Sequence, residues 1–146
     1  MYRKLVITLL VAASAGGFTA QPSARGACLR YEPDTVRLTG RIERHMYYGP
    51  PNFGEDPAHD EKEVGFYVGL AAPVCAEGGQ DPELNVPRRG VRRVQLVLDS
   101  AGYARLRPHL GQRVTLRGTL FASHTGHHHT PILLVVSQPV RMERTP

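Results

Sequence analysis

The sequence lacks most of the features by which membrane-spanning proteins and enzymes are recognised. Its most apolar stretch, residues 5–15, is shorter than the roughly 20 apolar residues that a membrane-spanning helix needs. It contains no Gly-x-Ser-x-Gly nucleophile elbow, no His-Glu-x-x-His motif and no phosphate-cradling glycine loop. We therefore expect no transmembrane segment, and these absences favour a function other than catalysis.

Cysteine is also scarce, because the 146 residues include two, Cys28 and Cys75. The chain begins with Arg3 and Lys4, continues with the apolar run and then has small residues, an order typical of a secretory signal peptide. We assign this signal to about residues 1–20 and predict a periplasmic or secreted protein. Thiols are oxidised in such compartments, so the two cysteines are predicted to form a disulfide.

The remaining chain has patterns typical of strands. Apolar and polar residues alternate over residues 35–43, where Gly40 indicates a bend, and further strands are predicted at 64–75, 92–99, 112–123 and 130–140. Residues 100–111 predict a short helix that Ser100 caps and Pro108 keeps brief or kinked. The segments between the first three strands, rich in glycine and proline, predict loops.

These elements predict the fold class. Five strands with a short helix between the third and fourth match a mostly β fold, a small five-stranded OB-like Greek-key barrel. A β-sandwich needs roughly seven strands, more than the pattern supplies. We therefore predict a single OB-like domain over residues 28–140.

Several segments resemble a family of exported bacterial proteins, domain of unknown function 4431. They include CLRYEPDTVRLTGRI, LAAPVC, VQLVL, LGQRVTLRGTLF and TGHHHTPILLVV, and they cover residues 28 to about 136. The most specific part is the strand GTLF followed by the histidine run. The resemblance implies a small exported domain without an assigned activity, and it implies that the histidines are native to the protein.

The segment FASHTGHHHT, residues 121–130, contains four histidines. If the flanking strands were joined by a two-residue turn at Thr125 and Gly126, His124 would lie opposite His127, and His129 would share their face. Three imidazoles could then bind zinc or copper and leave a position for water. A four-residue turn would scatter them, and the simpler alternative is a polar hairpin without a metal.

The loop between the first two strands contains the second group of candidate residues, Tyr47, Tyr48 and Phe53. In OB-folds this loop borders the usual ligand face. Aromatic side chains on a loop stiffened by prolines suit recognition, although such a loop could instead fold back over one end of the barrel.

Two functions follow from these residues. The leading hypothesis is a non-enzymatic periplasmic binding module that holds a protein partner or small ligand through the aromatic loop and the histidine segment. The alternative is a zinc- or copper-binding protein, with metal-dependent hydrolysis as its enzymatic form. Nucleic-acid binding is not expected, because the strand faces carry few aromatics and the formal net charge of +5 is modest.

Overall fold

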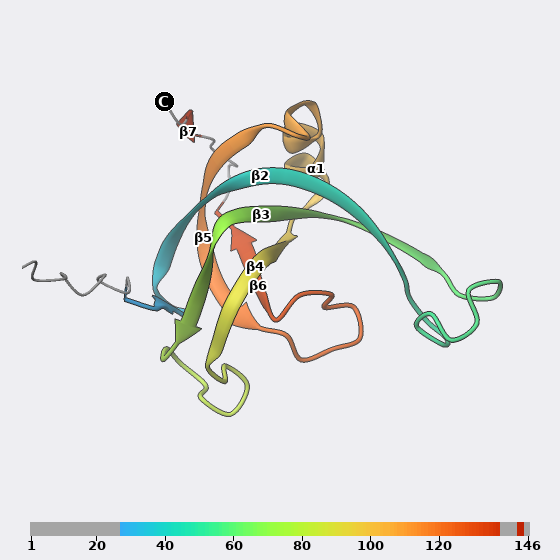
Figure 1. Ribbon diagram of the computed structural model, residues 1–146, viewed down its shortest axis with the longest axis horizontal. Coiled ribbons are helices and arrows are strands. Elements are labelled where there is room, and N and C mark those ends of the chain that lie inside the picture. The colour runs from blue at the N-terminus through green and yellow to red at the C-terminus, as the bar shows by residue number, and fades with distance from the viewer. Residues whose placement is uncertain (1–26, 138–142, 145–146) are drawn as a thin grey trace, which may run out of the picture.

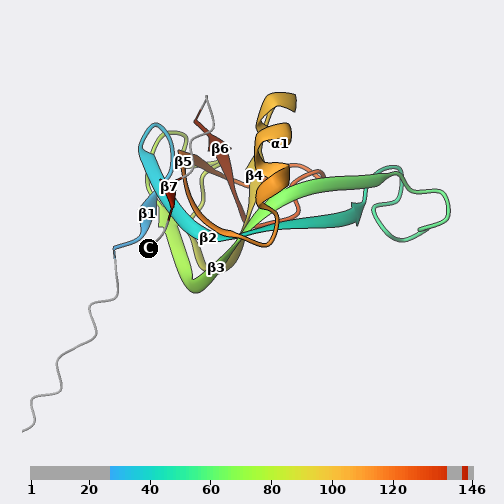
Figure 2. The ribbon, with the colours of Figure 1, turned by 90° about the horizontal axis from the view of Figure 1, so that it is seen from above.

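The computed structural model describes residues 27–137 and 143–144. Within them the chain forms seven strands, one α-helix and one 3₁₀ helix (Figures 1 and 2). In chain order these are β1 (Leu29–Arg30), β2 (Thr35–Tyr48), β3 (Lys62–Glu77), β4 (Arg88–Val97), α1 (Ser100–Leu106), η1 (Arg107–His109), β5 (Arg113–Ala122), β6 (Ile132–Val136) and β7 (Glu143–Arg144). The predicted signal peptide and residues 138–140 of the predicted domain lie outside the described residues.

Five of the strands close into a mixed barrel. Strand β2 pairs antiparallel with both β3 and β5, β3 pairs antiparallel with β4, and β5 pairs antiparallel with β6. The barrel is completed by the parallel pairing of β4 with β6. This is the strand order of an OB-fold, with the short helix between β4 and β5, so the predicted fold class is confirmed.

The barrel interior is filled by the alternate residues that the strand patterns placed inside. The largest fully buried side chains there include Ile42, Leu116, Leu120 and Leu134. Helix α1 packs against the barrel through Leu106, which is also fully buried, and through Tyr103, whose ring lies edge-on to that of Phe66. In the strands, the side-chain period of two determines which residues enter the core, and the helix adds its own buried side chains.

Strands β2 and β3 are longer than the barrel needs. Their pairing continues as far as Tyr48 and Lys62, so the two strands project beyond the barrel as an arm that ends in the loop 49–61 (Figure 1). The sequence predicted that the first strand ends before this region and that residues 47–63 form a loop. The arm places that loop at a distance from the barrel, on the side where the loop 123–131 also lies.

The ends of other elements also differ from the predictions. The residue that caps α1 is Asp99, whose carboxylate accepts a hydrogen bond from the Gly102 amide, and not Ser100. The helix is brief, as predicted, and Pro108 lies in the short 3₁₀ helix that follows it. Strand β3 passes through Pro73 and continues to Glu77 by an irregular pairing with β4. Proline is tolerated in a strand at such irregularities, where no ladder hydrogen bond is required of it.

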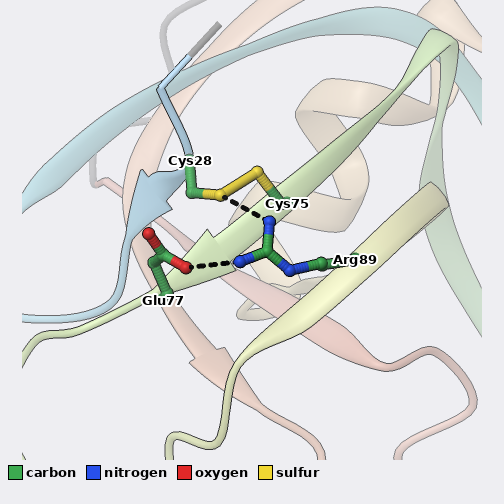
Figure 3. The surroundings of a disulfide bond; sticks show 4 residues. All are labelled: Cys28, Cys75, Glu77 and Arg89. Carbon is green, nitrogen blue, oxygen red and sulfur yellow. Dashed lines mark hydrogen bonds and ion pairs between the residues drawn. A yellow bond between two sulfur atoms is a disulfide. The ribbon is translucent and has the colours of Figure 1, made fainter. Parts of the chain in front are cut away.

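Cys28 and Cys75 form the predicted disulfide, with their Cα atoms 4.7 Å apart (Figure 3). The bond joins the residue before β1 to the end of β3, where the two strands pair in parallel. Arg89 of β4 lies over it, since its guanidinium is 3.7 Å from the Cys28 sulfur and forms an ion pair of 3.1 Å with Glu77. No helix among the described residues is long and apolar enough to cross a membrane.

Candidate functional site

The aromatic loop and the histidine segment meet on the outer face of the sheet. Tyr47 of β2 stacks on His129 with ring centroids 4.3 Å apart and planes within 5° of parallel. Phe53 of the loop 49–61 lies edge-on to His127, with centroids 6.2 Å apart. Residues that the sequence suggested as two separate candidates therefore form one site. Tyr48 is not part of it, because the alternation of side chains along β2 directs it to the opposite face from Tyr47.

A third side chain, Glu63 at the start of β3, holds the two histidines together. Its carboxylate is hydrogen-bonded to His129 Nε2 at 2.7 Å and, through the other oxygen, to His127 Nδ1. Glu63 lies here because it pairs with Tyr47 across β2 and β3 and so shares the outer face. The result is a carboxylate shared by two imidazoles, with Tyr47 stacked on one of them.

The floor of the site is the ring of Tyr67, which is fully buried although it belongs to the outer face of β3. Tyr47 and His45 cover it, with ring centroids 5.7 and 5.3 Å from its own. Burial raises the pKa of its hydroxyl, which has no hydrogen-bond partner among the described residues. The aromatic cluster therefore stays uncharged at this position and excludes water from beneath Tyr47.

The histidine segment is a loop and does not continue the hairpin. Pairing of β5 with β6 ends at Ala122 and Ile132, followed by one hydrogen bond from the Ser123 amide to the Pro131 carbonyl. Pro131 has no amide hydrogen to return that bond, so the ladder stops there. The two-residue turn that we considered at Thr125 and Gly126 is therefore not formed, and neither is the four-residue alternative.

As a consequence, His124 is separated from the other two candidate ligands. Its amide donates to His128 Nδ1 at 3.1 Å, and the two rings meet edge to face beside Phe121. Burial lowers the pKa of His128, and the nearby His124 lowers it further. The four histidines thus divide into the pair 124 and 128 and the pair 127 and 129.

Gln95 of β4 fixes the loop to the barrel. Its side-chain amide donates to the His127 carbonyl at 3.0 Å and its oxygen accepts from the His129 amide at 2.7 Å. The backbone amide of Gln95 donates a third hydrogen bond, of 2.9 Å, to the Thr130 hydroxyl. These three hydrogen bonds, all made by Gln95, fix His127 and His129 in place relative to the barrel.

The loop 49–61 is also fixed, because Asp60 acts as its internal anchor. The Asp60 carboxylate accepts hydrogen bonds of 2.7 Å from the amides of Asn52 and Gly54, the two neighbours of Phe53. Burial alone would raise the pKa of Asp60, but these bonds outweigh it and the pKa lies below its ordinary value. The anchor leaves the Phe53 side chain 49% exposed at the tip of the loop.

A second feature of the outer face is a hollow of about 490 Å³ on the barrel wall. Its lining is mainly cationic, with four arginines and one carboxylate: Arg41, Glu43, Arg92, Arg93 and Arg113. Arg93 contacts both Glu43, at 2.9 Å, and Tyr47, so the hollow adjoins the aromatic cluster. A further hollow of about 520 Å³ lies between the arm and α1, lined by Phe66, Tyr103 and Leu110 among others.

The arrangement of side chains bears on the metal hypothesis. Among the residues that the structure describes, no group of three or more histidine, cysteine or acidic side chains is arranged to hold a metal ion. Glu63 occupies the space in which the imidazoles of His127 and His129 converge. Metal binding by His124, His127 and His129 stays a prediction, and it requires a rearrangement that brings His124 to the other pair.

Sequence reasoning missed Glu63, Gln95, Tyr67 and the arginine hollow. Glu63 fell within the predicted loop 47–63, and no role was assigned to Arg92 or Arg93. Their roles depend on pairing across strands, which a single sequence does not specify. The alternation along β3 would have placed Glu63 and Tyr67 on one face, had that strand been extended to residue 62.

The Glu63 clamp, in which the Glu63 carboxylate holds His127 and His129 together, leads to a prediction for acidic pH. Burial raises the pKa of Glu63, but hydrogen bonds from His129 and His127 outweigh it, so the pKa lies below its ordinary value. The clamp therefore stabilises the protein above the ordinary glutamate pKa, and this contribution is lost as pH falls through the lowered value. We expect Glu63→Gln to cost about 2 kcal/mol near neutral pH and much less in acid. Urea denaturation at both pH values measures this.

The matched control is Glu61→Gln, two residues away on the exposed part of the loop. It should leave the free energy of unfolding unchanged at both pH values, because no side-chain partner of Glu61 is found among the described residues. A Glu63→Gln effect that is the same in acid as at neutral pH would show that the carboxylate charge does not hold the histidines.

Comparison with known proteins bears on the predicted family. The family model for domain of unknown function 4431 matches residues 93–140, which run from the middle of β4 through the histidine loop and β6. The resemblance noted from the sequence is confirmed over this segment. No curated protein and no solved structure matches the chain.

Proposed function

We propose that the protein is an exported, non-enzymatic binding module that recognises a partner through the surface where the loops 49–61 and 123–131 meet. Export is supported by the charged and apolar N-terminal sequence and is consistent with the disulfide. In OB-folds the loop between the first two barrel strands and the loop between the last two border the ligand face. The loops 49–61 and 123–131 occupy these two positions.

The observation that carries the proposal is the presentation of Phe53. A half-exposed phenylalanine at a loop tip offers apolar surface whose burial by a partner is favourable, and Asp60 and the histidine loop hold it there. A Cβ atom at Gly126 would come within 2.8 Å of the Phe53 ring, so the two loops are in close contact. Because the surface is already ordered, little conformational entropy is lost when a partner binds.

The alternative proposal, a zinc or copper protein, has less support. His127 and His129 with Glu63 are residue types that zinc accepts, but both imidazoles already share hydrogen bonds with the carboxylate. His124, the third ligand of the sequence hypothesis, is engaged with His128. The binding-module proposal needs no rearrangement of these side chains, so we prefer it.

Site-specific photocrosslinking tests the proposal. We expect a photoreactive phenylalanine analogue at position 53, in protein exported to the periplasm of the native host, to give a discrete crosslinked product. The same analogue at position 84 is the matched control, because Leu84 is 50% exposed but lies in the loop 78–87, away from the site. Tyr47→Ala should reduce the product at position 53 by about tenfold, as expected when an aromatic anchor of an interface is removed.

Two results would count against this function. The first is a crosslinking pattern at position 53 that matches the pattern at position 84. The second is a product at position 53 that persists unchanged after Tyr47→Ala, which would show that Phe53 meets its partner outside the aromatic surface.

A further inference from the structure

We infer that the arginine hollow on the barrel wall is a binding site for a small oxyanion ligand that carries at least two negative charges. The hollow is lined by Arg41 and Glu43 of β2, Arg92 and Arg93 of β4, and Arg113 of β5, over a floor formed partly by β3. This inference goes beyond the proposed recognition surface and does not depend on it.

The positions of the arginines are imposed by the barrel. Arg41 and Arg113 are direct cross-strand partners in the antiparallel pair of β2 and β5. Like charges opposite each other in a sheet destabilise the pair. Among the described residues, the carboxylate that lines the hollow is Glu43, and it is engaged by both Arg93, at 2.9 Å, and His45, at 2.8 Å. The hollow therefore keeps an excess of positive charge.

Two of the guanidinium groups are held in place and two are available. Arg41 donates to the Gly111 carbonyl, and Arg93 donates to Glu43. Arg92 and Arg113 are exposed, and the described part of the chain contains no hydrogen bond or ion pair from their side chains. An anion that entered the hollow would meet two positioned cations and two that can close on it.

The floor of the hollow is bare backbone at Gly40 and Gly69. A Cβ atom at Gly69 would come within 2.2 Å of the Glu43 carboxylate, and one at Gly40 within 2.4 Å of the Gly69 carbonyl oxygen. A side chain at Gly69 would therefore displace the Glu43 carboxylate, and one at Gly40 would collide with the backbone of β3. The volume of about 490 Å³ lies within the range of small-molecule sites.

The chemistry of arginine identifies the class of ligand. Its planar, forked guanidinium matches the oxygen pairs of phosphate and carboxylate groups and binds them through two parallel hydrogen bonds. Several arginines around one hollow suit a compact molecule with two or more such groups. Inorganic pyrophosphate and citrate represent the phosphate and carboxylate forms of this chemistry.

Titration calorimetry of the mature, exported protein with pyrophosphate and with citrate tests the inference. We expect one molecule of at least one probe to bind per chain, more weakly as salt screens the charges. Arg92→Gln combined with Arg113→Gln should weaken binding by about tenfold or more, since each variant removes a charge-assisted contact. The matched control, Arg105→Gln with Arg107→Gln, makes the same change in net charge on α1 and η1 and should stay within about twofold.

Thermal unfolding gives a second readout that also shows whether the variant is folded. The bound probe should raise the melting temperature of the wild-type protein, and it should not raise that of the Arg92→Gln and Arg113→Gln variant. Without ligand that variant should melt no lower than the wild type, because the change relieves repulsion. The inference is overturned if neither probe binds, or if the control variant loses as much affinity as the hollow variant.

Discussion

Replacing Cys28 and Cys75 together by serine should lower the free energy of unfolding by about 4 kcal/mol. The two cysteines are 47 residues apart, and a cross-link over a loop of that length removes much of the freedom of the unfolded chain. The loss would be close to the whole stability of a marginal small domain. We therefore expect the serine variant to be partly unfolded under conditions in which the wild-type protein is folded.

The local structure indicates where unfolding would begin. Strand β1 has two residues and pairs with the end of β3 through Leu29 and Arg30. Next to it, Tyr31 is fully buried and donates a hydrogen bond of 3.0 Å to the Val86 carbonyl. Without the cross-link the pairing of β1 with β3 is two residues long, so we expect β1 to detach first and the adjacent Tyr31 contact to be lost next.

Urea denaturation followed by tyrosine fluorescence or circular dichroism measures the effect. The wild-type protein under reducing conditions is the matched comparison, because breaking the bond without changing a side chain should give the same loss. Equal stability of the wild type and the serine variant under oxidising conditions would show that the bond does not constrain the unfolded chain as argued.

The fold was largely predictable because it depends on residue patterns that repeat. Alternation with a period of two identified the first, third and fourth barrel strands, and the short helix was recognised from the helical spacing of its apolar residues between Ser100 and Gly111. The cap was assigned to Ser100 and belongs to Asp99, one residue earlier. That difference is small, because both residue types can cap a helix and the sequence does not choose between them.

The candidate site was predictable in its residue types but not in its geometry. Tyr47, Phe53, His127 and His129 were recognised because the aromatic residues group around two prolines and the histidines cluster within ten residues. The position of the two histidines depends on Glu63, which reaches them from β3, 64 and 66 residues earlier in the chain. The sequence of the histidine segment does not indicate that Glu63 is its partner.

The predicted pairing of the histidines across a two-residue turn was wrong for a different reason. A two-residue turn is the commonest hairpin connection, and its assumption placed His124 opposite His127. Pro131 ends the ladder early, and Gln95 offers the loop a set of hydrogen bonds that a tight hairpin would lack. A proline next to a predicted strand end is therefore evidence for a longer loop.

The glycines of the barrel were predicted in part, and they lead to the second large effect. Gly40 was expected at a bend, and it lies where the pairing of β2 changes from β5 to β3. The alternation of side chains along β5 places Gly118 on its inner face, between Leu116 and Leu120. In the structure a Cβ atom at Gly118 would come within 2.1 Å of the Val135 carbonyl oxygen and 3.0 Å of the Leu134 side chain.

We therefore expect Gly118→Ala to lower the free energy of unfolding by about 3 kcal/mol, at the upper end of the range for overpacked interiors. Backbone cannot move aside as a flexible side chain can, and Val135 is held on both sides by pairing with β4 and β5. Relief would require β6 to separate from β5. Because β6 closes the barrel, the cost should fall on the whole domain and not on one loop.

Gly90→Ala is the matched control for this substitution. Gly90 has a φ of +69° but no atom within 4 Å of the added Cβ, so its variant should lose only about 1 kcal/mol through the strained backbone. Chemical denaturation of both variants separates steric crowding from conformational strain. If Gly118→Ala costs no more than Gly90→Ala, then β6 can shift without loss, and the closed barrel is more adaptable than its close backbone contacts indicate.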